Sequence, residues 1–271
     1  MNVIVFGAHP DDCEYYAGGT AALWTGAGHR VRFVSLTNGE AGHHEIHGEA
    51  LAARRRAEAA EAARRGGVSW AVLDHRDGRL LPTLVAREQV IREIRTWRAD
   101  LVLGHRPYDY HPDHRAAAAL VQDAAFLVMV PHIAPEVPPL RRNPVFLYME
   151  DDFRRPLPFS PDIVVAIDET VDRKIAMLDA HASQFYEWLP WLSGDPTPVP
   201  EASRRAWLVE RWLRTPGAET REALARWYGS DRAEATRYAE AFEICEYGSR
   251  PSEARIRELF PFLRPGSARP T

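Results

Sequence analysis

Short apolar runs alternate with longer helical segments along this chain, and this alternation constrains the fold more than any other feature of the sequence. Runs that are apolar throughout are typical of strands buried on both faces. Strands that alternate with helices of ten or more residues indicate parallel βαβ units with right-handed crossovers. We therefore predict a Rossmann-like, doubly wound α/β fold with a mostly parallel sheet, whose strands are expected at Val3–Gly7, Val31–Leu36, Trp70–Leu73, Leu101–Leu103, Val145–Met149 and Ile163–Ile167.

The segments between these runs have helical character. Glu49–Arg65 is rich in Ala, Arg and Glu and is followed by two glycines, a common helix stop. Further helices are predicted at Thr20–Gly28, Leu84–Trp97 and Asp172–Ala182. The polar stretch from His9 to Tyr16 is expected to be irregular.

The character of the sequence changes after Gln184, where five of the eight tryptophans fall within residues 185–229. We predict three units: a core at 1–184, a Trp-rich helical insertion at 185–229, and a C-terminal segment at 230–271 that returns to the core. The tryptophans have helical spacing, which favours packing on the core over stacking on sugars or a subunit interface. Arg264–Thr271 is expected to be a frayed end.

Charge and cysteine content exclude several classes of protein. The formal net charge is −4 and no basic stripe is present, which argues against nucleic-acid binding. The two cysteines lie far apart and do not form a disulfide framework. The chain has neither a signal-peptide pattern nor a long apolar span, so we expect a cytoplasmic protein with no membrane association.

Two turns rich in histidine and aspartate follow the first and fourth predicted strands. The first reads AHPDDCE at 8–14, and the second reads GHRPYDYHPDHR at 104–115. In the strand order 3-2-1-4-5 these strands are neighbours across the topological switch point, where such sheets bind ligands. The two turns should therefore face each other across one crevice, although either turn alone would be an ordinary solvated turn.

Imidazoles and carboxylates in one crevice favour a borderline cation such as zinc. A catalytic zinc takes three protein ligands and leaves one position open, which predicts His9, Asp12 and His114 as ligands. Asp11 would then be free to act as general base, and His111 to stabilise an oxyanion or protonate a leaving amine. His43, His44 and His47 are expected to form a mobile rim loop, with a second metal site as an alternative.

These motifs resemble the PIG-L/LmbE-like family of zinc-dependent N-acetylglucosaminyl deacetylases. The resemblance rests on HPDD at 9–12, Glu at 14, GGT at 18–20 and HPDH at 111–114. Matching features are TNGE at 37–40, an R-x-x-E pair at 55 and 58, DG at 77–78 and H-x-S-Q at 181–184. The resemblance covers roughly residues 1–184, so the Trp-rich stretch departs from the common pattern.

The resemblance implies Zn²⁺ held by His9, Asp12 and His114, with Asp11 as base and His111 as a transition-state stabiliser. It places Arg55, Asp77 and His181 among the substrate-binding residues, with His181 serving its own or a neighbouring subunit. Helical spacing also allows an alternative for Arg55, a surface ion pair with Glu58 that has no function in the site. A histidine on an apolar helix face, such as His181, is more often structural.

The function expected from the sequence is removal of an N-acetyl group from an amino sugar or an N-acetylglucosamine-containing conjugate. The resemblance also implies a homo-oligomer. Two alternatives for the function stay open at this point. One is an amidase that acts on a thiol conjugate or antibiotic intermediate. The other is a non-catalytic protein that binds a metal or nucleotide on the same scaffold, which would need neither Asp11 nor His111.

Overall fold

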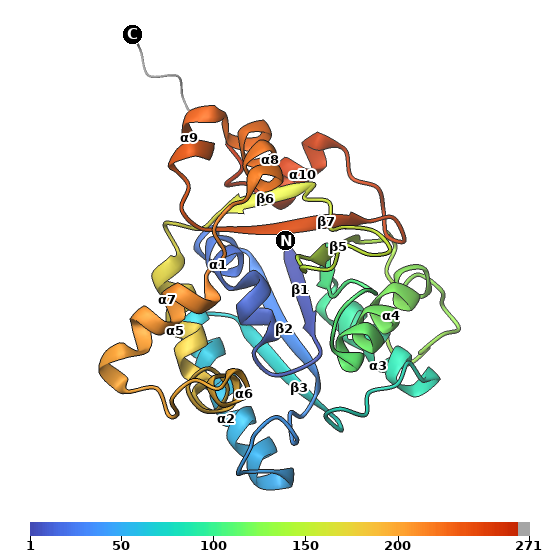
Figure 1. Cartoon of the computed structure of the whole chain (residues 1–271). Helices are drawn as coiled ribbons and strands as arrows, with labels where there is room; N and C mark the ends of the chain where they lie inside the picture. Colours follow the sequence, from blue (N-terminus) through green and yellow to red (C-terminus); the bar gives the residue numbers. More distant parts are fainter. Residues whose placement is uncertain (265–271) are drawn as a thin grey trace.

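Within residues 1–264, the part of the chain that the computed structural model describes, one seven-stranded sheet has the order β3-β2-β1-β4-β5-β7-β6 (Figure 1). The first five strands in space are parallel, and β7 runs antiparallel to both of its neighbours. The predicted α/β fold is confirmed. The strands are β1 (Asn2–Gly7), β2 (Arg30–Thr37), β3 (Ser69–His75), β4 (Leu101–Gly104), β5 (Val145–Met149), β6 (Ile163–Ala166) and β7 (Ala239–Cys245).

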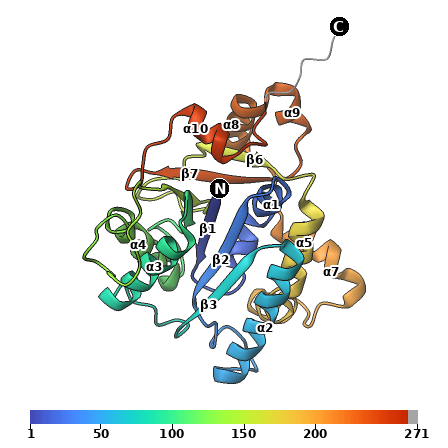
Figure 2. The same cartoon turned by 180° about the vertical axis from the view of Figure 1, so that it is seen from behind.

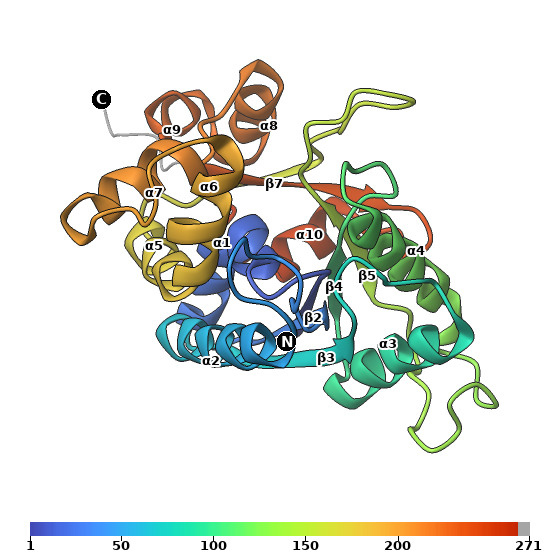
Figure 3. The ribbon, with the colours of Figure 1, turned by 60° about the horizontal axis from the view of Figure 1, so that its bottom comes forward.

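Helices cover both faces of the sheet, as the views from behind and from below show (Figures 2 and 3). On one face lie α1, α2 and α5, and on the other lie α3 and α4. β1 is apolar throughout because both of its faces are buried. Val3 and Val5 enter one core cluster, and Ile4 and Phe6 enter the other. The five helices are α1 (Asp12–Gly26), α2 (Gly48–Gly66), α3 (Leu84–Trp97), α4 (Pro112–Leu127) and α5 (Val171–Ala180).

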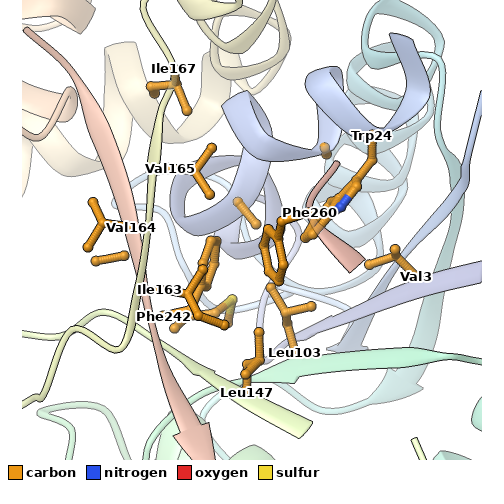
Figure 4. Packing of buried hydrophobic residues seen from close by; sticks show 14 of the residues in the cluster. Val3, Trp24, Leu103, Leu147, Ile163, Val164, Val165, Ile167, Phe242 and Phe260 are labelled. Carbon is orange, nitrogen blue, oxygen red and sulfur yellow. The ribbon is translucent and has the colours of Figure 1, made fainter. Parts of the chain in front are cut away.

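The larger core cluster joins the start of the chain to its C-terminal part (Figure 4). The Trp24 ring of α1 packs against the Phe260 ring at a centroid distance of 5.1 Å, and its indole Nε1 donates to the carbonyl of Leu259 (2.8 Å). Phe242 of β7 lies in the same cluster, which spans α1, the sheet and α10 (Glu253–Leu259). The C-terminal part therefore packs on the core that the first strands build.

Helix α1 begins at Asp12, so the expected irregular stretch from His9 to Tyr16 is wrong for most of its length. Gly19 lies inside the helix because the backbone is closely packed there: a Cβ atom would lie 2.8 Å from Ile167. The N–H groups of Gly19 and Thr20 donate to Glu240 of β7 at 2.8 and 2.7 Å. The GGT motif is thus a packing feature that ties α1 to the far half of the sheet.

Helix α4, which starts directly at the second histidine-rich turn, was not predicted from the sequence. Pro112 occupies the first turn of this helix, where a missing N–H group costs nothing, and the His111 side chain accepts from the N–H of Asp113. The sequence HPDH was interpreted as a set of metal ligands, so its histidine cap and its proline in the first turn were not recognised as the start of a helix.

The Trp-rich stretch divides into two parts that pack in different places. Its first part forms a third cluster with α5 that includes Phe185, Leu208 and Trp212, whereas Trp227 of α8 joins the main core. The elements between residues 183 and 235 are a π-helix η1 (Ser183–Trp188), α6 (Leu189–Ser193), η2 (Glu201–Ser203), α7 (Arg204–Trp212), α8 (Ala218–Tyr228) and α9 (Ser230–Ala235).

Residues 265–271, which make up nearly all of the predicted frayed end, lie outside the described residues. In the part that is described, none of the helices has the length and apolar character to cross a membrane.

Candidate active site

The two histidine-rich turns meet at the carboxyl ends of β1 and β4, which are adjacent in the sheet as predicted. A cavity of about 440 Å³ opens there. Its floor is polar and comes from these turns, from α2 and from the segment after β3, while residues 185–214 supply much of its apolar side. The floor side chains are His9, Asp11, Asp12, Arg55, Asp77, Asp109, His111 and His114.

Three side chains form a small triangle in this floor. His9 Nδ1 lies 3.2 Å from His114 Nε2 and 3.5 Å from Asp12 Oδ2, and His114 Nε2 lies 3.5 Å from Asp12 Oδ1. Tetrahedral zinc ligands with bonds of about 2.0–2.2 Å lie roughly 3.4 Å apart. The donor set and its spacing therefore fit a divalent cation.

The same cluster offers other combinations of ligands. Three overlapping sets of three side chains have potential ligand atoms within 4.8 Å of one another: His9, His111 and His114; Asp12, His105 and His114; and His9, Asp77 and Asp113. We favour the His9, Asp12 and His114 triangle because its distances of 3.2, 3.5 and 3.5 Å match the spacing of tetrahedral ligands. Backbone contacts do not separate the sets, since Asp12 accepts the N–H of His9 (2.8 Å) just as His111 and Asp113 accept backbone N–H groups.

Carboxylates behind the triangle orient its two imidazoles. The Nε2 atom of His9 faces Asp77 Oδ1 at 3.2 Å and Asp113 Oδ2 at 3.4 Å, and His114 Nδ1 faces Asp109 Oδ1 at 3.1 Å. These contacts turn the opposite ring nitrogens toward the centre, as outer carboxylates do around metal-binding histidines. Burial opposes the charged imidazolium, but the surrounding carboxylates raise the pKa of His9 well above its usual value.

Asp109, Asp113 and His105 occupy positions in the site that were not predicted from the sequence. His105 stacks on His114 at a centroid distance of 4.1 Å, and its Nε2 atom lies 3.3 Å from Asp12 Oδ2 and accepts from the N–H of Ala8 (3.1 Å). All three residues lie in the second turn. Their proximity to the predicted ligands was the only available signal.

Asp11 is held in an unusual conformation at the N-terminus of α1. Its φ of 146° is rarely adopted by residues other than glycine, and such strain concentrates at functional sites. Arg55 Nη2 lies 3.2 Å from Asp11 Oδ2. Burial raises the pKa of Asp11 to about 6, and Arg55 opposes this rise. The carboxyl is therefore suited to exchange a proton near neutral pH.

Arg55 is 2% exposed, so the alternative of a surface ion pair with Glu58 is wrong. Its guanidinium donates to the carbonyls of Pro10 (2.9 Å) and Gly39 (3.3 Å), which ties α2 to both neighbouring turns. Glu58 instead pairs with Arg54 at 3.1 Å. Asp77 accepts from the N–H of Ala41 (3.1 Å), and together with Arg55 it lines the cavity.

The His111 imidazole has a defined hydrogen-bonding direction. Its Nδ1 atom accepts from the N–H of Asp113 (3.1 Å), which leaves the proton of the neutral ring on Nε2. Burial, together with the nearby His9 and His114, lowers the pKa of His111. The neutral ring is thus able to donate a hydrogen bond into the cavity that it lines.

His181 lies behind this floor and does not line the cavity. The side chain is 0% exposed, and its Nε2 atom lies 3.3 Å from Glu14 Oε1 of α1. Burial lowers its pKa, but Glu14 and Asp11 outweigh this and raise it. Within one chain, His181 therefore contacts the start of α1, next to Asp11, and does not face the substrate cavity.

Residues 4–125 match the family model described as PIG-L, GlcNAc-PI de-N-acetylase. In sequence, the chain is 30% identical over 205 residues to diacetylchitobiose deacetylase of Thermococcus kodakarensis, and the match covers 70% of this chain and 74% of that protein. The relative is named as a deacetylase, and the family model is described as a de-N-acetylase.

Solved structures have the same fold. N,N'-diacetylchitobiose deacetylase from Pyrococcus horikoshii has a TM-score of 0.67 at 24% identity, covering 90% of this chain and 84% of that chain. The conserved protein TT1542 from Thermus thermophilus has a TM-score of 0.65 at 26% identity, covering 90% and 94%. The 4-carboxy-2-hydroxymuconate hydratase GalB of Pseudomonas putida has a TM-score of 0.69 at 22% identity, covering 93% and 99%. Since a hydratase has this fold too, the fold alone does not define the reaction.

Proposed function

Because the chain belongs to the PIG-L family of N-deacetylases, we propose that it is a zinc-dependent hydrolase acting on an N-acetylglucosamine unit of a saccharide or conjugate. The triangle of His9, Asp12 and His114 is the observation that carries the proposal. The names of the relatives support an acetylated amino sugar as substrate. The strained Asp11 beside the triangle supports a catalytic function over simple metal binding.

His9, Asp12 and His114 would hold the ion, with their orientation maintained by Asp77, Asp113 and Asp109. A zinc ion bound there would polarise the acetyl carbonyl and lower the pKa of a water molecule to ~7. Three protein donors would leave one coordination position for water or the substrate. The buried setting also limits competing solvent around the reacting groups.

Asp11 is the proposed general base that accepts the proton of the attacking water. Its contact with Arg55 fixes the carboxylate beside the triangle, and its raised pKa keeps it basic enough for the task. His111 would donate its Nε2 proton in a hydrogen bond to the oxygen that gains charge as the carbonyl is attacked. The amine then leaves after protonation, for which Asp11 holds the proton it has taken.

The remaining predicted residues have different relations to the substrate. Arg55 and Asp77 line the cavity next to Asp11, and we propose that they contact the sugar. For His181 we propose a supporting function through Glu14, since its buried side chain has no access to the cavity of its own chain.

The test combines metal content with acetate release from the methyl glycoside of N-acetylglucosamine. The purified protein should contain close to one zinc ion per chain, and it should release acetate in amounts equal to the free amine formed. Chelation should abolish the activity and added zinc should restore it. Zinc binding without acetate release from any N-acetylated sugar would favour the alternative of a non-catalytic binding protein. Acetate release from a thiol conjugate alone would favour the alternative of an amidase that acts on such conjugates.

A further inference from the structure

Large apolar side chains gather at the mouth of the active-site cavity. Tyr110 is 69% exposed and Leu192 is 62% exposed, although both line the cavity, and Phe153 is also exposed there. Exposed apolar groups grouped around one opening mark a surface that contacts a ligand. An acetamide held at the metal-ligand triangle would keep the sugar near the cavity floor. We therefore assign these exposed groups at the opening to a part of the substrate beyond the sugar.

Aromatic rings in this region form a continuous parallel stack. His43 and His44 stack at a centroid distance of 4.5 Å, the His44 ring stacks on Trp191 at 5.0 Å, and Trp191 stacks on Trp188 at 5.3 Å. The interplanar angles are 18°, 6° and 17°. Trp188 is the member of this stack that lines the cavity. The stack therefore fixes the plane of the Trp188 ring, which a flat group in the cavity can contact.

Polar contacts hold the segment that carries Trp188. Ser183, at the start of the π-helix, donates from its hydroxyl to Glu58 (2.6 Å), and Gln184 donates to the carbonyl of Gly42 (3.0 Å). Glu187 accepts from Arg54 at 2.6 and 2.7 Å. π-helical turns occur frequently at functional sites. We call the cavity-lining part of residues 185–214 the aromatic wall. These contacts attach the wall to α2 and to the rim loop.

The charges that line the cavity are predominantly negative. Its lining contains six carboxylates and two guanidinium groups within the described residues. Arg55 faces Asp11 and Asp77, and Arg214 pairs with Asp152 (3.0 Å) and Glu150 (3.5 Å), so both guanidinium groups already have carboxylate partners. Even with a divalent cation bound, the lining carries excess negative charge. A phosphate or carboxylate on the substrate would be repelled.

From these observations we infer that the cavity takes a neutral or cationic conjugate of N-acetylglucosamine in which a flat aromatic group is joined to the sugar, and that this group stacks on Trp188. The inference rests on the proposed deacetylase function and defines its substrate class more closely. Trp188 is then a specificity residue for the group beyond the acetamide, while Asp11 and the metal-ligand triangle act on the amide.

The experiment compares four C1 derivatives of N-acetylglucosamine: the methyl, octyl and 2-naphthyl glycosides and the 1-phosphate. Each is scored by kcat/KM for acetate release from the zinc-loaded enzyme. We expect the naphthyl glycoside to exceed the methyl glycoside by about tenfold, the scale of an aromatic contact with its buried area, and to exceed the octyl glycoside. The 1-phosphate should be the poorest substrate.

Trp188→Ala should lower kcat/KM for the naphthyl glycoside more than for the methyl glycoside, and Trp188→Phe should keep most of the preference. Tyr247→Ala, which removes an exposed aromatic ring that does not line the cavity, is the control and should leave both rates as they are. Equal rates for the methyl and naphthyl glycosides, or an octyl glycoside as good as the naphthyl one, would overturn the inference. A preference for the 1-phosphate would do the same. Absence of acetate from all four substrates would instead contradict the proposed function itself.

Discussion

The two sides of the active-site cavity differ in chemistry and in how the chain builds them. The polar floor takes its key residues from two short segments, 9–12 and 109–114, each following a parallel strand. The aromatic wall takes its residues from 185–214, where helices pack on α5 and on Tyr15 of α1. Residues that perform chemistry need fixed distances, which strand ends provide, whereas residues that select a substrate need only a suitable surface.

The difference extends to the contacts that support each side. Imidazoles and carboxylates of the floor are cross-linked, so that His9 alone faces Asp12, Asp77 and Asp113. The wall depends on ring packing, as between Trp212 and Phe185 at 5.1 Å. We therefore expect substitutions in the floor to remove metal or turnover, and substitutions in the wall to alter substrate binding.

The largest effect is expected from His114→Ala. This variant removes one of three proposed inner ligands, and residues that only contact a ligand from outside do not replace a direct bond to the ion. We expect loss of most bound zinc, measured by elemental analysis of the dialysed protein, together with loss of activity. Full zinc content in a His9→Ala, His114→Ala double variant would show that the ion binds elsewhere.

Asp11→Asn should lower kcat by ~10²–10⁴-fold, because an amide cannot accept the proton of the attacking water. Zinc content and KM should change little, since Asp11 is not a proposed ligand. Asp12→Asn is the matched comparison, because it alters the neighbouring carboxylate and should weaken zinc retention. Zinc loss in the first variant with retention in the second would mean that the two carboxylates have the opposite functions.

In the aromatic wall, Trp212→Ala should raise KM by about tenfold and change kcat less than KM, because an aromatic contact and its buried area are worth roughly that factor. The indole packs edge-to-face on Tyr15 (5.8 Å) and Phe185 (5.1 Å) and lines the cavity, so its loss removes binding surface but no reacting group. Steady-state kinetics with the methyl glycoside measure both constants. Arg205→Ala on the exposed side of α7 is the control and should behave as wild type. A fall in kcat alone would assign the wall a function in the chemical step.

The smallest effect is expected from Glu187→Gln, which weakens the contacts of the wall with Arg54 and His43. Because Glu187 and Arg54 are partly exposed, the loss in unfolding free energy should be about 1 kcal/mol or less. The rim loop at 41–48 should nevertheless be cleaved faster by thermolysin. Glu61→Gln, which breaks an exposed pair on the same α2 helix, is the matched control. Equal cleavage of both variants would show that Glu187 does not hold the loop.

Much of the fold was predictable because its signals are local and repeated. The strand at Val145–Met149 and the helix at Leu84–Trp97 have the predicted bounds, since burial on both faces and a regular apolar spacing mark them clearly. The start of α1 was not predictable in this way. Its first turn carries site residues, and Gly19 further along packs closely against Ile167. The N–H groups of Gly19 and Thr20 donate to Glu240, a partner 220 residues away from Thr20 in the chain.

The meeting of the two histidine-rich turns in one crevice was predictable from the amino-acid pattern without coordinates, because the order of parallel strands brings these turns together whatever the rest of the chain does. Side-chain directions were not. The folded molecule was needed to place Asp113 and Asp109 against different imidazoles, to bury Arg55 against Asp11, and to bring Trp188 to the cavity. These arrangements depend on packing between distant segments, whereas a sequence pattern specifies only the spacing of residues along the chain.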